Sequence, residues 1–554
     1  MDWKGNPINK EKHGGSKAAW FIYIMVAMTS AIFMPNVLDL VLYLRNSMHM
    51  GIAASSTAVT NLVSGTCAFS LLGGFLSDSY ITRFKAILIF GPFEFLGFGL
   101  LALQAHFPSL HPPECKISAQ DSNCRQIHGN NAALLYIAMY TVAFGEGCLR
   151  ANLASFGGDQ FDDEDPIESR KKSSFFNWFG VSTAVGNVSG LILIVWIENN
   201  KGWPYGFLLS AVLLLLGLTV LASGFAFYRN QRPRGSPITR MLQVFVAAFK
   251  KGKLTLPPTE ELLHQELVKE EMVAGEVLPH TEGLKCLDKA SIVRGNAGKW
   301  SLCPVTQVEE TKVVVRMLPI FISAVLGYIP IPLLFTLTVQ QGSTMDTKLG
   351  GIQIATPTLL IIPLIVQMIL LVLYDRYLVP FARKLTGYKS GITQLQRIGV
   401  GFLFTALATS VAALIEMKRK KIAEEHGLLN TTHVPMTIMW VILQFLAVGI
   451  TEVCQFVGLL EFFNSEVSRG MKSLGTAIFW CMVGLASLMG SVLINVVNSA
   501  TTNLHSRIGW LEGNNLNKNY LDRFYWLLSV LELLSFLNYL FWAKRYVYRR
   551  DPRG

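Results

Sequence analysis

Twelve apolar runs, each long enough to cross a lipid bilayer, constrain this chain of 554 residues more than any other feature. A helix needs roughly 20 apolar residues to span the hydrocarbon core. Because the bilayer offers no water to backbone groups, a chain with many such runs folds as a helical bundle. The predicted spans are Ala18–Leu44, Gly51–Leu76, Ala86–His106, Asn131–Ser155, Ser174–Ile197, Tyr205–Tyr228, Val313–Val339, Ile352–Tyr374, Ile392–Met417, Pro435–Phe463, Leu474–Asn498 and Leu521–Trp542.

The charge of the chain fits a membrane protein better than a nucleic-acid-binding protein. Charged residues make up 15% of the chain, against about a quarter in soluble domains. The formal net charge of +11 is what Lys- and Arg-rich cytoplasmic loops produce, and no basic patch interleaves with stacking aromatic residues. We therefore expect the lipid bilayer, and no nucleic acid, as a partner.

The distribution of basic residues predicts the orientation of the spans. Clusters of Lys and Arg all fall on one side of the membrane if the number of spans is even, which makes both termini cytoplasmic. The segment Lys418–Lys421 would then lie outside, balanced nearby by Glu424 and Glu425. The consistent clusters are at positions 4–17, 83–85, 170–172, 376–389 and 544–550.

Two external loops carry candidate modification sites. Cys115 and Cys124 lie in one polar loop, where an oxidising compartment allows either a disulfide or two free thiols. Asn430 begins an N-glycosylation sequon, Asn-Thr-Thr, in a second external loop. Because sequons also occur by chance, occupancy of Asn430 stays open.

A long polar stretch divides the chain into two halves. Residues 1–228 and 312–554 hold six spans each, and residues 229–311 form a cytoplasmic linker with an amphipathic segment at 237–251. Such a segment is able to lie on the inner membrane surface, and the linker as a whole is expected to be a tether. Two six-span halves around a central site are typical of secondary transporters.

The fourth span carries two charges, Glu146 and Arg150. Charged side chains at this depth are costly and normally face a bundle interior or a wet cavity. The i, i+4 spacing places both on one helix face, and the planar guanidinium binds carboxylates with two parallel bonds. We expect Arg150 to read an anion in a transport cavity.

Several motifs together identify a family resemblance. The loop Gly73–Tyr80, followed by Arg83 and Lys85, resembles the loop signature of the major facilitator superfamily. With Gly158–Asp162, Ser174–Trp178 and Val457–Phe463, the chain is similar to the plant nitrate-and-peptide transporters, within the proton-dependent oligopeptide transporter group. The resemblance is strongest to the subgroup that holds abscisic acid, gibberellin and nitrate transporters. It implies an all-α membrane protein of twelve transmembrane helices in two six-helix halves.

Departures from the family pattern shape the expected chemistry. The first-span Glu-x-x-Glu-Arg motif of the family, which serves proton coupling, corresponds here to Val26, Thr29 and Ser30, without a carboxylate. Ile331 stands where a histidine marks one nitrate site of the family, and Glu452 matches the usual tenth-span glutamate. Coupling through the first span and nitrate binding of that type are therefore both in question.

The expected site combines these residues. An Arg150–Glu452 ion pair between the halves is expected to gate the cavity, and an anionic substrate would compete for Arg150. Glu146 is either the proton-coupling group or only the local partner of Arg150. Glu94 and Asp39 are read as helix–helix hydrogen-bond partners. Other candidate substrate-binding residues are Tyr43, Phe69, Tyr328, Ile331, Phe335 and Trp480, and the candidate gating latch is Asp78, Arg83 and Asp159.

The predicted function is secondary transport of a small organic anion, such as abscisic acid or gibberellin, across the plasma membrane or, alternatively, the vacuolar membrane. Nitrate transport, an uncoupled facilitator and a non-transporting sensor are the alternatives. No nucleotide-binding P-loop, metalloprotease or hydrolase motif is present, so we expect neither an enzyme nor a cofactor or metal. Any energy then comes from a gradient, and protons are a candidate partner.

Overall fold

The computed structural model describes residues 13–548 apart from short gaps. The gaps are 114–125, 163–164, 232–236, 255–277, 279, 294–297, 299, 350–351, 387–391, 430, 432, 468–471, 505–508 and 514. Cys115, Cys124 and Asn430 thus lie outside the described residues, and the disulfide and glycosylation predictions stay predictions.

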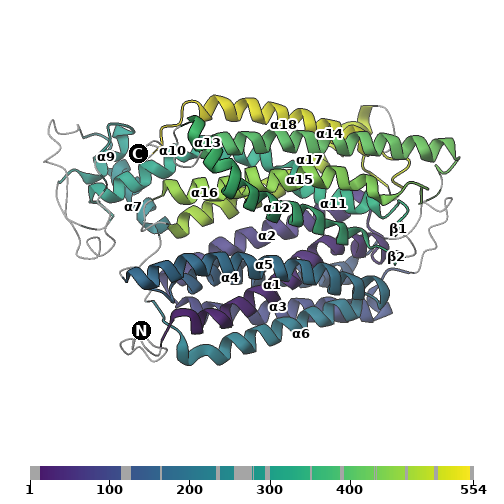
Figure 1. The fold of residues 1–554 in the computed structure, drawn as a ribbon, viewed down its shortest axis with the longest axis horizontal. Helices are drawn as coiled ribbons and strands as arrows, with labels where there is room; N and C mark the ends of the chain where they lie inside the picture. Colours follow the sequence, from purple (N-terminus) through teal and green to yellow (C-terminus); the bar gives the residue numbers. More distant parts are fainter. Residues whose placement is uncertain are drawn as a thin grey trace.

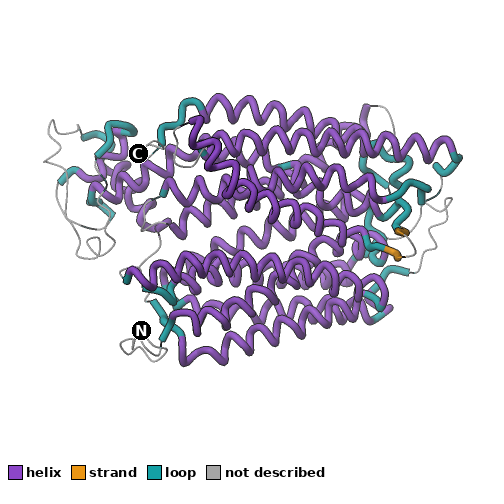
Figure 2. The backbone as a smooth tube through the Cα atoms, in the orientation of Figure 1, coloured by secondary structure: helices purple, strands orange, loops and turns teal. Residues whose placement is uncertain are grey.

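The described chain is almost entirely helical (Figure 2). Twelve of its helical segments are long and apolar enough to cross a membrane, which confirms the predicted fold class. The first half contains α1 (Gly15–Asn46), α2 (Ile52–Ser79), α3 (Arg83–His106), α4 (Gly129–Gly158), α5 (Pro166–Asn200) and α6 (Trp203–Ser223). The second half contains α10 (Val305–Tyr328), α11 (Pro330–Gly342), α12 (Ile361–Leu373), α13 (Val379–Thr386), α14 (Gln394–Glu425), α15 (Ile442–Thr451), α16 (Val457–Glu466), α17 (Lys472–Leu504) and α18 (Leu521–Ala543).

Three spans of the second half are broken helices. Pro330 lacks a backbone N–H and starts α11 directly after α10, so the seventh span is a pair of helices covering Val305–Gly342. π-helical turns at Tyr374–Leu378 and Glu452–Phe456 interrupt the eighth and tenth spans. The predicted start of the eighth span at Ile352 was wrong, because β1 (Lys348–Leu349) and β2 (Ile352–Gln353) form a short antiparallel pair there.

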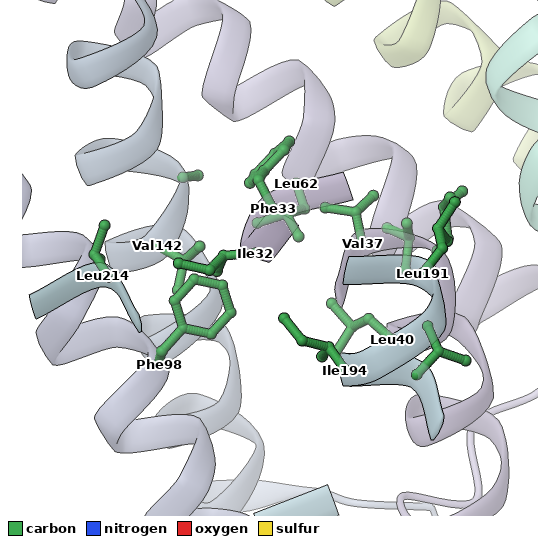
Figure 3. Packing of buried hydrophobic residues seen from close by; sticks show 14 of the residues in the cluster. Ile32, Phe33, Val37, Leu40, Leu62, Phe98, Val142, Leu191, Ile194 and Leu214 are labelled. Carbon is green, nitrogen blue, oxygen red and sulfur yellow. The ribbon is translucent and has the colours of Figure 1, made fainter. Parts of the chain in front are cut away.

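The helices form two bundles that lie side by side (Figure 1). Two large buried apolar clusters form the core. One is built mainly from the first half and the other mainly from the second, and each includes some residues of the other half. Figure 3 shows part of the first cluster, where Phe33, Leu62, Phe98 and Val142 interdigitate. The start of α1, the end of α18, α7 (Pro237–Lys250) and α9 (Lys285–Asp288) lie at one end of the molecule, here called the linker end. The β pair lies at the opposite end.

The linker is docked onto the second half. Val244, Ala247 and Ala248 of α7 are buried in a small apolar cluster with Cys303 and Val308. The other side of α7 leaves an apolar row exposed, which consists of Ile238, Leu242, Phe245 and Phe249. Burial raises the pKa of the Cys303 thiol to about 11. The tether expected from the sequence therefore contains a helix packed against its neighbours.

Ion pairs hold the linker at both ends. The Lys312 Nζ lies 2.7 Å from both Asp288 and Glu309, and all three side chains are buried. At the start of the linker, Arg229 Nη1 lies 2.6 Å from Glu168 Oε2 and Nη2 donates to Oε1 at 3.1 Å. These hydrogen bonds from Arg229 lower the pKa of the Glu168 carboxyl.

The basic segment Lys418–Lys421, which opposed the orientation rule, has partners at the opposite end. Arg419 is fully buried, with Nη2 at 2.6 Å from Glu416 and Nη1 donating to Asn517 at 2.5 Å. Lys420 pairs with Asp522 at 2.7 Å, and Lys418 lies 3.3 Å from the centre of the Trp440 ring. Because these charges are paired or stacked, they do not act as free loop charges in the sense of the orientation rule.

Candidate functional site

The Arg150 guanidinium is bound on one edge by its own helix. Nη2 lies 2.7 Å and Nε 3.0 Å from Glu146 Oε1. The spacing of four residues brings the carboxylate one helical turn below the arginine, as expected for an i, i+4 pair. Glu146 is buried, whereas 27% of the Arg150 side chain is exposed. The second edge of the guanidinium, with Nη1, has no hydrogen-bond partner among the described residues.

Aromatic rings contact the same guanidinium from both halves. The Arg150 Cζ lies 4.8 Å from the centre of the Phe33 ring on α1 and 5.0 Å from the Trp480 ring on α17. Cations within about 6 Å of a ring centre are attracted by its quadrupole. Arg150 therefore links the two bundles through Trp480 and keeps an apolar surface beside its free edge.

An aromatic chain continues from Trp480 into the second half. Phe456 lies 6.2 Å from Trp480 and 6.2 Å from Tyr328, measured between ring centres. The Tyr328 hydroxyl and the Glu452 carboxyl are close enough to interact electrostatically. Glu452 and Phe456 are the ends of one π-helical turn, and such turns are frequent at functional sites. The structure thus gathers Arg150, Trp480, Tyr328 and Glu452 along one path.

The predicted Arg150–Glu452 ion pair is not among the salt bridges of the described residues. The carboxylate that pairs with Arg150 is Glu146, which the helix itself places within reach. Glu452 is turned to Tyr328, and the ring of Phe456 comes between this pair and Trp480 in the chain of contacts. The hypothesis that Glu146 is the local partner of Arg150 therefore agrees with the geometry of the pair.

The other predicted lining residues are dispersed. Tyr43 packs between Trp203 and Phe207 inside the first bundle, and Ile331 is buried in the core of the second. Phe69 forms an edge-to-face contact with Phe144, and Phe335 packs against both cores.

Sequence reasoning missed Phe33 and Phe456. Both had a signal, because Phe33 follows Ser30 by three residues and Phe456 follows Glu452 by four, on the same helix faces.

A small cleft opens between α2, α4 and α17. Its walls include Gly74 from α2, Ala151 and Ser155 from α4, and Ala477 and Trp480 from α17; Ile238 of α7 also lines it. Ala151, the next residue after Arg150, and Trp480, whose ring Arg150 contacts, both line the cleft. Polar residues of the predicted latch, Asp78 and Arg83, line the same cleft.

At the end of the molecule opposite the linker end, α2 and α17 contact each other along a seam that closes the space between the two halves. The hydroxyls of Thr60 and Ser491 share a hydrogen bond of 2.5 Å. Two turns further along each helix, Cys67 lies so close to Gly484 that an added Cβ would be 2.6 Å from the Cys67 Cβ. Two more turns lead to Gly74 and Ala477, which line the cleft instead. The helices are therefore in contact at one end and separated at the linker end.

Further cross-links reinforce the closed end. Gln340 of α11 donates to Ser56 at 2.7 Å, and Arg45 donates to the Gln340 carbonyl at 3.4 Å. The structure therefore represents a form whose passage is open at the linker end.

The predicted latch forms an ion-pair bridge among three helices. Arg83 Nη1 lies 2.5 Å from Asp159, and Nη2 lies 3.2 Å from Asp78. The bridge ties the ends of α2, α3 and α4 within the first half. Asp159 thus pairs with Arg83.

Comparison with known proteins places the chain in a family. The POT family model matches residues 84–511. The protein NRT1/PTR family 4.5 of Arabidopsis thaliana is 39% identical over 549 residues, which is 99% of this chain and 96% of that protein. A solved auto-inhibited POT family peptide transporter has a TM-score of 0.71 at 19% identity and covers 97% of this chain and 99% of its own. A POT family transporter in complex with 5-aminolevulinic acid has a TM-score of 0.64 at 11% identity, covering 98% and 100%.

The solved structures and the related sequences support different parts of the conclusion, the fold and the family. At 11–19% identity the solved structures show the fold alone, whereas the family model and the plant relative extend over most of the sequence. The resemblance inferred from the motifs is thereby confirmed. The chain is a multi-pass membrane protein that belongs to the POT family of transporters, with relatives among the plant NRT1/PTR proteins.

Proposed function

We propose that this protein transports a small organic anion with a carboxylate and an apolar body, of the abscisic acid or gibberellin kind, by alternating access. The observation that carries the proposal is the Arg150 guanidinium. One of its edges is held by Glu146, the other edge has no partner among the described residues, and its faces contact Phe33 and Trp480. A carboxylate fits the open edge with two parallel hydrogen bonds, and an apolar body fits the rings.

The aromatic surroundings favour an organic anion over nitrate. Trp480, Phe456 and Tyr328 form a continuous apolar surface from Arg150 to Glu452, which a bare inorganic ion would leave unused. Ile331, at the position of the family's histidine, is buried in the second core and offers no hydrogen-bond donor on its side chain. Nitrate is the second candidate, because its planar oxygens also match an arginine edge.

The orientation follows from the basic clusters and the shape of the cleft. If the linker end is cytoplasmic, as the Lys and Arg bias predicts, this form is open to the cytoplasm and closed at the seam of Thr60 and Ser491. Rocking of the halves would break that seam and close the cleft at Gly74 and Ala477. Glu452, which lies next to Tyr328 at the end of the aromatic path, would change its surroundings as the halves move. We propose the plasma membrane as its location.

A competition assay in proteoliposomes tests the proposal. Uptake of radiolabelled abscisic acid is measured with unlabelled gibberellin, nitrate or a dipeptide as competitor, with and without an ionophore. We expect gibberellin to compete and nitrate and the dipeptide not to. Competition by nitrate alone would favour the second candidate. Binding without uptake would indicate a sensor, and uptake that ignores the ionophore would indicate a facilitator.

Two variants test the role of Arg150. Arg150→Ala removes charge-assisted bonds worth about 1.5–3 kcal/mol each, so we expect the KM for the organic anion to rise at least about tenfold. The matched control is Arg523→Ala, because Arg523 also lies over two rings, Tyr520 at 4.4 Å and Trp510 at 6.0 Å, away from the cleft. Unchanged KM in Arg150→Ala would refute the site.

A further inference from the structure

A buried carboxyl on α3 lies against the Arg150 site. Glu94 is fully buried, and neither of its carboxyl oxygens has a hydrogen-bond partner among the described residues. Its backbone touches Gly145 of α4 so closely that a Cβ on Gly145 would collide with the Glu94 backbone N and Cα. Glu94 therefore packs against the residue that precedes Glu146, at a close contact between α3 and α4.

The charged groups that act on Glu94 come from α4. They are Glu146, which repels its ionised form, and Arg150, which attracts it. On α3 itself, the remaining titratable side chains, Arg83, Lys85 and His106, lie in the end turns of the helix. The helix α6, which also packs on α3, contributes only Tyr205, in its first turn. Two buried carboxyls thus share a single guanidinium.

Charge balance decides how many protons this cluster holds. Arg150 is engaged by Glu146 Oε1, while Glu146 Oε2 is buried and without a partner among the described residues. One guanidinium neutralises one carboxylate. A second ionised carboxyl would be a buried charge without compensation, and such a group takes up a proton instead. The resting cluster is therefore neutral when one of the two carboxyls is protonated.

Resting on the proposed function, we propose that Glu94 and Glu146 form a two-carboxyl proton site that couples one proton to each monovalent anion. At rest, Glu94 is protonated and Glu146 is ionised on Arg150. A substrate carboxylate on the open edge of Arg150 adds one negative charge, and a proton bound by Glu146 restores neutrality. When the substrate leaves on the other side, Glu146 releases that proton and pairs with Arg150 again. No other reactant is needed.

The resting proton is tested without any substrate. Infrared difference spectra between the wild-type protein and Glu94→Gln, both in lipid at neutral pH, report which form of the carboxyl the substitution removes. We expect loss of a protonated carboxylic acid C=O band. Loss of carboxylate bands instead would show that Glu94 is ionised and would overturn the proposal. Glu532→Gln gives the matched spectrum, because Glu532 on α18 is equally buried and also without a hydrogen-bond partner among the described residues.

Coupling is tested with abscisic acid as the probe in proteoliposomes that are acidic outside and neutral inside. In the wild type we expect one proton to enter per molecule of abscisic acid. Glu146→Gln is expected to lose gradient-driven accumulation while exchange of labelled for unlabelled abscisic acid continues. Glu94→Gln mimics the protonated group, so we expect the alkaline limit of uptake to move up by at least about one pH unit, a tenfold change in proton concentration. Glu532→Gln should match the wild type.

The outcomes separate this proposal from the proposed function. If the wild type takes up no organic anion, the substrate class is wrong, and the infrared measurement alone decides the proton on Glu94. If uptake is normal but Glu94→Gln has the pH profile of the wild type, or Glu146→Gln still accumulates substrate against its gradient, the two-carboxyl site is wrong. If either variant fails to fold, the number of protons that enter with each molecule of abscisic acid in the wild type still tests the predicted one-to-one ratio.

Discussion

The seam between α2 and α17 predicts that Gly484→Ala changes the balance between the two forms of the transporter. A Cβ at position 484 would lie 2.6 Å from the Cys67 Cβ on the other half, closer than side chains approach in real structures. The seam joins the two halves, so the collision exists only while the end opposite the linker is closed. The substitution should therefore penalise the form described here and leave the alternative form untouched.

The size of this effect follows from the packing. An extra carbon in a well-packed contact costs about 1–3 kcal/mol. A difference of that size changes the ratio of two states about 5- to 150-fold. The open-seam form is the minor one in a protein that rests as described here, so its population should rise by about this factor.

Cysteine labelling at Thr60 measures that population. Thr60 is buried in the closed seam, and Thr60→Cys in an otherwise cysteine-free protein reacts with a membrane-impermeant maleimide only when the seam opens. Replacing Cys67 with Ala keeps the Cβ that causes the collision. We expect Gly484→Ala to increase the labelling rate by about 5- to 150-fold, the same factor as the population, and replacing residue 67 with Gly to reverse the increase.

A second glycine provides the control. A Cβ on Gly97 would also lie 2.6 Å from its neighbour, Val142 Cγ2, but both residues belong to the first half. Gly97→Ala should lower thermal stability without faster labelling at Thr60. If Gly484→Ala labels no faster than its parent, or Gly97→Ala labels equally fast, the seam does not control the balance of the two forms.

Three further predictions concern the linker. Lys312→Met removes the ammonium group that lies between two buried carboxylates and should cost about 3–5 kcal/mol, seen as faster limited proteolysis of the linker. Lys421→Met, at an exposed pair of 3.9 Å, should change little. Arg229 lowers the pKa of Glu168, so the ionised carboxyl stabilises the fold at pH values above its unfolded pKa of about 4.3, and this stability is lost as the pH falls through the folded pKa. The acid-induced drop in melting temperature should therefore be smaller in Glu168→Gln than in the wild type. An equal drop would contradict the role of the pair. Cys303, whose buried thiol has a pKa of about 11, should react much more slowly with iodoacetamide at mildly alkaline pH than the exposed Cys286, and equal rates would show that the linker is not docked.

The twelve spans were predictable because the length and polarity of each run are set by the bilayer. Interruptions inside a span were not, since a π-helical turn such as Glu452–Phe456 preserves the apolar composition of its surroundings. The misplaced start at Ile352 has the same origin, because an apolar residue in a short strand looks like the first turn of a helix. The apolar composition of a segment shows that it is buried in the membrane, but it does not show whether its backbone is a continuous helix.

Only the contacts within a single helix of the site were predictable from the sequence. The pairing of Glu146 with Arg150 follows from their spacing, but the choice between Glu146 and Glu452 as partner depends on how the halves pack. Arg419 illustrates the same limit, since its partner Asn517 lies far along the chain. Contacts between distant segments depend on side-chain packing that a single sequence does not display.

The docking of α7 has a mechanical consequence. This helix is anchored to the second half through Val244 and Ala247, while its first turn reaches the cleft through Ile238. If the second half rotates as a rigid body, α7 moves with it across the mouth of the cleft. A protein that binds the linker, or a covalent modification of the linker, would then directly affect the opening and closing of the cleft.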